Sequence, residues 1–177
     1  MAEVFVNALS KSSGIVATNS NGTVGANATT ITGISTAGVS VGYLVDNQHF
    51  RGGAKVSAVG SGQVTVDKTS TNTASAANQH VKFLGPTATY ASPASTKSIL
   101  IGGTFSNLTN NNVNITVEIV TGITSTTIAN DIPVPSGSSF VISDAGKTVL
   151  AGGDVVNIYC DTENAIDVTL GVLQGVS

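Results

Sequence analysis

The clearest structural signal in the chain is the alternating stretch Val113-Asn114-Ile115-Thr116-Val117-Glu118-Ile119-Val120. Successive side chains of a β-strand point to opposite faces, so we expect the odd-numbered residues of this stretch to share one buried face. Comparable short runs of valine, isoleucine and threonine recur along the chain, broken by glycine, asparagine, aspartate and proline. No window of roughly a dozen residues has the apolar spacing of an amphipathic helix. The sequence therefore predicts an all-β fold.

After the strand-like opening Val4–Thr18, the strand-like runs form two groups, one on each side of Gly85-Pro86. Those before it are Thr29–Ile34, Tyr43–Val45, Ala54–Val59, Gln63–Val66 and His80–Leu84. Those after it are Thr87–Tyr90, Lys97–Phe105, Val113–Val120, Thr126–Ile128, Ser138–Ile142, Lys147–Val149, Val155–Tyr159 and Ala165–Leu173. Many short strands at such spacing are typical of a β-sandwich or jelly roll.

The chain is predicted to contain one domain inserted into another. Residues 1–18 and 86–177 are expected to form a β-sandwich domain, and 19–85 an inserted small β module. The opening strand Val4–Thr18 has no evident continuation in the loose stretch after it, whereas Thr87–Tyr90 could resume beside it. The flanks Ser20-Asn21-Gly22 and Gly85-Pro86 resemble linkers, where insertions are tolerated. The polar run Lys68–Asn78 is expected to be a loop.

Glycine, asparagine and proline clusters mark the turns. Gly60-Ser61-Gly62 predicts a compact hairpin whose glycines take positive φ. The other predicted turns lie at Asn110-Asn111-Asn112, Pro135-Ser136-Gly137, Asp144-Ala145-Gly146 and Gly152-Gly153-Asp154.

The composition favours an assembling protein. Charged residues make up 10% of the 177 residues, against about 25% in ordinary soluble domains. A neutral polar surface suits close packing against copies of itself or other proteins, and a neutral monomer is the alternative. The net charge of -3 and the scattered lysines and arginines argue against a nucleic-acid partner.

Targeting and membrane signals are not evident in the sequence. The apolar runs are far shorter than the roughly 20 residues that span a bilayer, so we expect no membrane partner. The opening Met1–Val6 lacks a basic segment followed by a long apolar one, which predicts folding in a cytoplasm.

The sequence offers little catalytic chemistry, so we expect no enzyme activity, no catalytic residue and no cofactor. Neither His49 nor His80 has a serine, cysteine or acidic partner at a recognisable spacing. The single cysteine, Cys160, lies in an apolar run and is expected to be buried as a small hydrophobic residue. Four turn acids, Asp144, Asp154, Asp161 and Glu163, could offer oxygen ligands to Ca²⁺. Their spacing fits no calcium motif, so solvated turn residues are the favoured interpretation and no metal site is expected.

One loop is a candidate contact site. Asn47-Gln48-His49-Phe50-Arg51-Gly52-Gly53 joins two expected strands and places an aromatic residue beside a cation. Phenylalanine and arginine are typical contact residues, so His49, Phe50 and Arg51 are the candidate binding residues. Alternatively, Phe50 fills the core of the inserted module.

The second group of strands resembles small β-sandwich virion proteins of tailed bacteriophages, particularly marine and cyanobacterial phages. The resemblance rests on Ser98–Thr109, Val113–Ile119, Ile132–Ser139, Lys147–Asp154 and Ala165–Leu173, together with an opening strand similar to Phe5–Gly14. The inserted part, from Thr30–Ile34 to Gly62–Val66, is similar to a small β module that recurs in phage tail and fibre proteins.

This resemblance implies a non-enzymatic virion structural protein that is made in the host cytoplasm, most simply a capsid decoration or cement protein. Its partners would be other virion proteins of the capsid or tail and copies of itself. The alternative is a neck, tail or fibre-associated module that binds a receptor or a host-surface glycan. The absence of tryptophan weakens the glycan interpretation, because sugars usually stack on aromatic rings.

Overall fold

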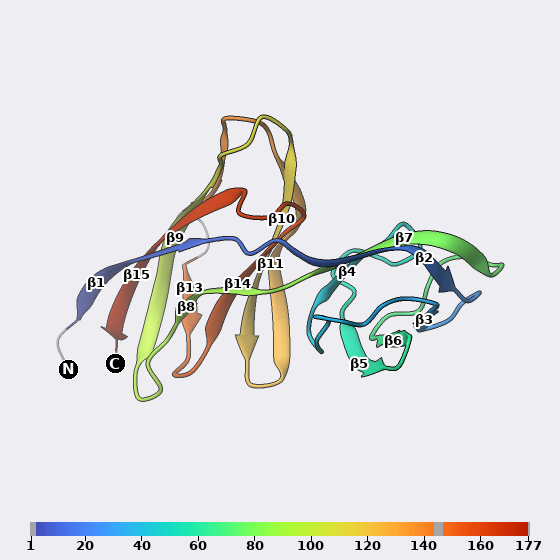
Figure 1. The fold of residues 1–177 in the computed structure, drawn as a ribbon. Helices are drawn as coiled ribbons and strands as arrows, with labels where there is room; N and C mark the ends of the chain where they lie inside the picture. Colours follow the sequence, from blue (N-terminus) through green and yellow to red (C-terminus); the bar gives the residue numbers. More distant parts are fainter. Residues whose placement is uncertain (1–2, 144–146, 177) are drawn as a thin grey trace. The chain divides into compact units, whose positions relative to one another are not determined.

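Residues 3–143 and 147–176, which the computed structural model describes, form fifteen strands and no helix (Figure 1). All the strand pairings are antiparallel, as expected for short strands joined by tight turns. The described residues accordingly include no helix that is long and apolar enough to cross a membrane. The predicted turn Asp144-Ala145-Gly146 lies outside the described residues.

The chain divides into unit 1, residues 1–12 and 87–177, and unit 2, residues 13–86. The prediction of an all-β sandwich with a small β domain inserted after its first strand is confirmed. The predicted boundary at residue 18 was too late. Residues from Ile15 onward pair with unit 2 strands, beginning with Ile15 opposite Leu84, so the insertion starts where the first sandwich strand ends.

Two sheets form the sandwich of unit 1. The first has the order β1 (Val4–Lys11), β15 (Ile166–Val176), β9 (Lys97–Asn107) and β12 (Ser139–Ile142), and β13 (Thr148–Leu150) also pairs with β9. The second has the order β11 (Thr124–Val134), β10 (Val113–Thr121), β14 (Val155–Cys160) and β8 (Thr87–Ala91). The first and last sandwich strands of the chain are neighbours, because β1 pairs with β15 along its whole length.

The core of unit 1 lies between the inner faces of these sheets. Its largest buried members include Phe105 and Leu170 from the first sheet and Ile115 and Ile158 from the second. Each large apolar side chain buried there contributes roughly 1.5–3 kcal/mol. Cys160 is fully buried in the same core, as predicted from its apolar strand.

Strand β10 departs from simple alternation. The odd-numbered residues Val113, Ile115 and Val117 are buried in the core as predicted, but Thr116 and Glu118 on the opposite face are buried as well. The sequence pattern therefore predicted the inner face of this strand correctly, but it did not predict that residues on the opposite face are buried as well.

Unit 2 is built on one sheet. Its strand order is β4 (Leu44–Asp46), β7 (Ala76–Leu84), β2 (Ile15–Val24), β3 (Thr30–Thr32), β6 (Gln63–Val66) and β5 (Val56–Gly60). The buried members of its core are Val24, Ile31, Ile34, Val39, Val45, Phe50, Ala54, Val56, Val64, Val66, Val81 and Phe83.

Two segments of unit 2 that were predicted as irregular are strands. Residues Asn19 to Val24 continue β2, and Ala76 to Asn78 begin β7. These segments are polar, but their backbones are paired: Asn19 lies opposite Val81, Gly22 opposite Gln79 and Val24 opposite Ala76. Backbone hydrogen bonds, rather than an apolar side-chain pattern, therefore extend both strands.

The turn glycines follow the prediction in part. In the Gly60-Ser61-Gly62 hairpin only Gly62 has a positive φ, of 69°, so the assignment of positive φ to Gly60 was wrong. In the turn after β13, Gly153 takes φ of 90°, whereas Gly152 is needed for a different reason. A Cβ at Gly152 would collide with the backbone carbonyl of Ala94, so this turn requires two glycines for two distinct causes.

Candidate functional site

The predicted contact loop of unit 2 does not present its three candidate residues together. Phe50 is buried in the unit 2 core, with 7% of its surface exposed. His49 is half-buried, with Nε2 lying 3.1 Å from Gln79 Oε1, and its backbone carbonyl accepts a hydrogen bond from the Thr71 amide. Arg51 is exposed beside a shallow hollow that Lys68 also lines. The loop therefore presents a cation and part of a histidine to solvent, but not the phenyl ring of Phe50.

Two of the turn acids, Asp154 and Asp161, accept hydrogen bonds from neighbouring residues of their own turns. Asp154 is buried, and its Oδ2 accepts a hydrogen bond of 2.8 Å from the Ala151 amide, which closes the turn before β14. Asp161 accepts a hydrogen bond from Thr162, and Glu163 is exposed. Across the described ranges no three histidine, cysteine or acidic residues are grouped as metal ligands would be. Asp144 lies outside the described residues.

The remaining predicted residue, His80, is exposed in the middle of β7 rather than at its start. Its backbone carbonyl accepts a hydrogen bond of 2.7 Å from the Asn47 side-chain amide. This bond ties the candidate loop to β7, so the part of His80 that the fold uses is its main chain.

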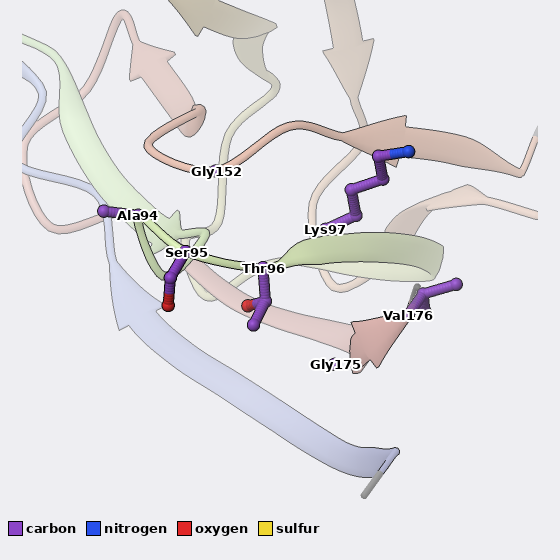
Figure 2. Close-up of a pocket in the computed structure, with 7 residues that line it drawn as sticks. All are labelled: Ala94, Ser95, Thr96, Lys97, Gly152, Gly175 and Val176. Atoms are coloured by element: carbon purple, nitrogen blue, oxygen red, sulfur yellow. The ribbon is translucent and has the colours of Figure 1, made fainter. Parts of the chain in front are cut away.

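A hollow of about 460 Å³ lies on unit 1 beside the β8–β9 connection (Figure 2). Small side chains and backbone surround it, since its lining residues are Ala94, Ser95, Thr96, Lys97, Gly152, Gly175 and Val176. Lys97 supplies the only titratable side chain of this lining. The hollow can hold a small polar group, but its lining offers no acid–base pair for proton transfer.

One buried polar pair lies on the second sheet of unit 1. The Tyr159 hydroxyl donates a hydrogen bond of 2.8 Å to Glu118 Oε1, and the two residues lie on adjacent strands β14 and β10. Burial raises the pKa of Tyr159 well above its usual range, and the nearby Glu118 carboxylate raises it further. A tyrosine held in its neutral form is a stable donor to the buried carboxylate, which gives the pair a structural role.

The most distinctive surface of unit 1 is the outer face of its first sheet. Phe5 pairs with Leu173, Leu173 with Ile99, and Ile99 with Val149, so these four side chains form one row across the sheet. Phe5 is 76% exposed and Val149 61% exposed. Isolated apolar side chains are normal on protein surfaces, whereas large contiguous apolar patches are common at interaction sites.

A second row reinforces this outer face. Leu9 pairs with Thr169, Thr169 with Thr104, and Thr104 with Val141. Leu9 is 72% exposed and Val141 56% exposed. Between the two rows Asn7 lies opposite Gly171, which pairs with Gly102, so the two inner strands carry no side chains there. The outer face therefore carries two ridges, one apolar and one with threonines between its apolar ends Leu9 and Val141, and the two glycines form a shallow trough between them.

Polar residues border the outer face at one end. Lys11 Nζ lies 3.5 Å from Asp167 Oδ1, and on the next strands the hydroxyls of Ser106 and Ser139 are 2.9 Å apart. Polar residues at the border of an apolar surface are common in protein–protein interfaces. In the sequence Phe5 and Leu9 are only part of the opening strand Val4–Thr18, because the sequence does not reveal that β15, β9, β12 and β13 continue the same face.

No family model, no curated protein and no solved structure matches the chain.

Proposed function

We propose that the chain is a non-enzymatic structural protein of a bacteriophage virion, and that it acts as a capsid decoration or cement protein. The observation that carries this proposal is the outer face of the first sheet, where Phe5, Leu9, Val141 and Val149 are more than half exposed. In a monomer such an apolar face stays unfavourably exposed to water, whereas a particle protein buries it against its neighbours.

The low charge supports the same function. With 10% charged residues the chain has few charges to desolvate when its surface is covered, and copies crowded on a particle repel each other weakly. The resemblance of unit 1 to small sandwich proteins of tailed-phage virions adds support from the sequence. In this function unit 1 docks on the particle through its outer face, and unit 2 is carried as an additional module.

The proposal is tested on purified particles of the phage that encodes the chain. Mass spectrometry is expected to detect the chain in DNA-filled particles after extensive washing, and cryo-electron microscopy should show added density on the capsid. A Phe5→Ser/Val149→Ser variant should bind washed particles at least tenfold more weakly, whereas the exposed-site control Glu163→Ser should bind normally. Absence of the chain from particles, with the free protein abundant in the lysate, would contradict the proposal.

A second candidate function is supported by unit 2. A hollow of about 390 Å³ on this unit is lined by polar side chains, namely Asp46, Asn47, Gln48, Asn78, Gln79, His80 and Lys82. Amide and charged groups are the partners that sugar hydroxyls use, so this hollow favours a receptor- or glycan-binding module at the neck, tail or fibre. Binding of the purified protein to host cells, lost in a Gln48→Ala/Gln79→Ala variant and retained in Glu163→Ala, would support this candidate over decoration.

A further inference from the structure

We propose that β1 is a self-association edge: it pairs antiparallel with β1 of a second copy of this chain, with Asn7 opposite Asn7. This inference deepens the self-assembly part of the proposed function by assigning it to one strand and one register. It rests on three independent observations: the unprotected edge, the direction of its free hydrogen-bonding groups, and the complementarity of its side chains.

The first observation is that β1 is a regular edge without protection. It ends the first sheet, and its eight residues pair with β15 without a register shift. Natural edges are usually blocked by prolines, bulges or shortness, and β1 contains no proline or glycine.

The other sandwich edges in the described part of unit 1 are blocked in these ways. Strand β11 contains Pro133, has Asp131 at φ 52°, and is bulged against β10. Strands β12 and β13 have four and three residues, and β8 has five residues with a register shift. Strand β1 is therefore the edge that a partner strand can extend.

The second observation is the direction of the free backbone groups. The Ser12 amide donates to the Ile166 carbonyl at 2.9 Å, which continues the β1–β15 ladder by one residue pair. Along a strand, alternate residues direct their N–H and C=O groups to the same side. The even-numbered residues therefore bond to β15, and Phe5, Asn7 and Leu9 direct their backbone groups to the open edge.

The third observation is that β1 is self-complementary in one register. With Asn7 opposite Asn7, the aromatic ring of Phe5 lies opposite Leu9 of the second copy, and the Glu3 carboxylate lies opposite the Lys11 ammonium. All these residues are odd-numbered, so their free backbone groups meet and their side chains share the outer face. Moving one strand by two residues in one direction would place Phe5 opposite Lys11 and Leu9 opposite Asn7. Moving it in the other direction would place Leu9 opposite Glu3 and Phe5 opposite Asn7.

This pairing has a consequence for the outer face. The ridges that begin at Phe5 and Leu9 would continue across the junction into the ridges of the second copy, because directly paired residues share a face. Two sheets would become one, with an apolar surface twice as wide for docking on a particle. The dimer would thus cover the free edge and enlarge the face that carries the proposed function.

Disulfide trapping in the full-length protein tests the pairing. The natural Cys160 is buried and its pKa is raised by burial, so it should not react. Asn7→Cys should form a disulfide-linked dimer under mild oxidation, because Cα atoms of a hydrogen-bonded antiparallel pair are about 5.5 Å apart, within the range of a disulfide.

The matched control is Thr169→Cys, which is also exposed on the outer face but lies on β15. In the proposed dimer the two copies of residue 169 are three strand spacings apart across the sheet, about 14 Å, and are also offset along the strands because Leu9 lies opposite Phe5, so they should not link. Face-to-face stacking would instead link Thr169→Cys in preference to Asn7→Cys, and that result would overturn the proposal.

The register is tested with two further variants. Phe5→Cys and Leu9→Cys should each remain unlinked alone, but an equimolar mixture should give a linked heterodimer. Linking of either variant with itself at the rate of Asn7→Cys would overturn the register. Sedimentation of the wild-type protein should show a species of about twice 17.6 kDa at tens of micromolar, and a strict monomer together with absent Asn7→Cys linking would overturn the pairing.

These outcomes separate this inference from the proposed function. A chain that is found in particles but does not link through Asn7→Cys overturns the β1 pairing and leaves the virion role in place. A chain that links as expected but is absent from particles retains the pairing and overturns the virion role.

Discussion

Glu118 is the residue whose burial most constrains unit 1, because a carboxylate with 1% exposure must be satisfied by hydrogen bonds. Its Oε1 accepts the Tyr159 hydroxyl at 2.8 Å. Glu118→Ala should lower the free energy of unfolding by about 1–3 kcal/mol, since the Tyr159 hydroxyl loses this acceptor inside the protein. Glu118→Gln, which keeps an acceptor oxygen, should cost less. Urea unfolding measures both, and an effect of Glu118→Ala no larger than that of the exposed Glu163→Ala would contradict this role.

The same pair predicts a pH dependence. Burial and the Glu118 carboxylate raise the pKa of Tyr159 in the folded protein above its unfolded value of about 10. Above that pH the unfolded chain loses the phenol proton while the folded chain keeps it, so the free energy of unfolding falls as pH rises. Below about pH 9 the phenol is protonated in both the folded and the unfolded chain, so Tyr159 should cause no pH dependence of the free energy of unfolding there. Urea midpoints measured from about pH 8 to 11 should fall more steeply for the wild type than for Tyr159→Phe, and equal slopes would contradict the assignment.

Gly152 and Gly153 offer a matched pair in one turn. A Cβ on Gly152 would collide with the backbone of Ala94, whereas a Cβ on Gly153 meets open space but must adopt φ of 90°. Gly153→Ala should cost about 1–2 kcal/mol of left-handed strain. Gly152→Ala should cost more, because two backbone segments must separate. Thermal unfolding of both variants provides the measurement, and a reversed order would mean that the 94–95 segment moves freely.

At the scale of elements, alternation in the sequence was enough to place most strands, because each buries one face against its own unit's core. The alternation pattern did not predict strands or buried residues where burial or pairing depends on residues far apart in the sequence. The polar start of β7 is a strand because β2 pairs with it, as in the Gln79–Gly22 pairing. The edge position of β1 could not be predicted either, since it follows from pairing Phe5 with Leu173 at the other end of the chain.

The β1 edge gives a prediction at this scale. Asn7→Pro should leave the monomer nearly as stable as the wild type, because the Asn7 amide faces away from β15. The same substitution should raise the dimer dissociation constant at least tenfold by removing a donor at the centre of the pairing. The matched control Ala8→Pro removes a donor that faces β15 and should lower the free energy of unfolding by about 1–3 kcal/mol. Thermal unfolding and sedimentation measure the two effects, and equal destabilisation by both prolines would refute the assigned hydrogen-bond directions.

For the whole molecule, the division into two units was predictable because composition changes at Gly85-Pro86, but the first boundary was not. Nothing in the polarity of residues 13–18 distinguishes a continuing sandwich strand from the first strand of the insert. The structure separates them through pairing, since Ile15 lies opposite Leu84 in unit 2. The sequence left two alternatives for Phe50, a surface contact or a core position, and pairing within unit 2 decides between them, because Phe50 lies in the unit 2 core.

The last prediction is that unit 1 folds without unit 2. Within unit 1 the two segments that a deletion would join lie close together, since Ser10 Oγ donates to Thr89 Oγ1 at 3.2 Å. A short Gly/Ser link can therefore replace residues 13–86. The described core of unit 1 contains seventeen buried residues, whereas that of unit 2 contains twelve in a single sheet.

The shortened protein should keep a β-rich circular dichroism spectrum and a cooperative thermal transition, because its core is complete without the insert. Residues 13–86 alone should unfold at a lower temperature, because a shorter chain buries a smaller fraction of its surface on folding. The shortened protein should also still form the Asn7→Cys disulfide, because β1 belongs wholly to unit 1. If it unfolds while the isolated insert folds cooperatively, then unit 2 is the scaffold on which the sandwich depends.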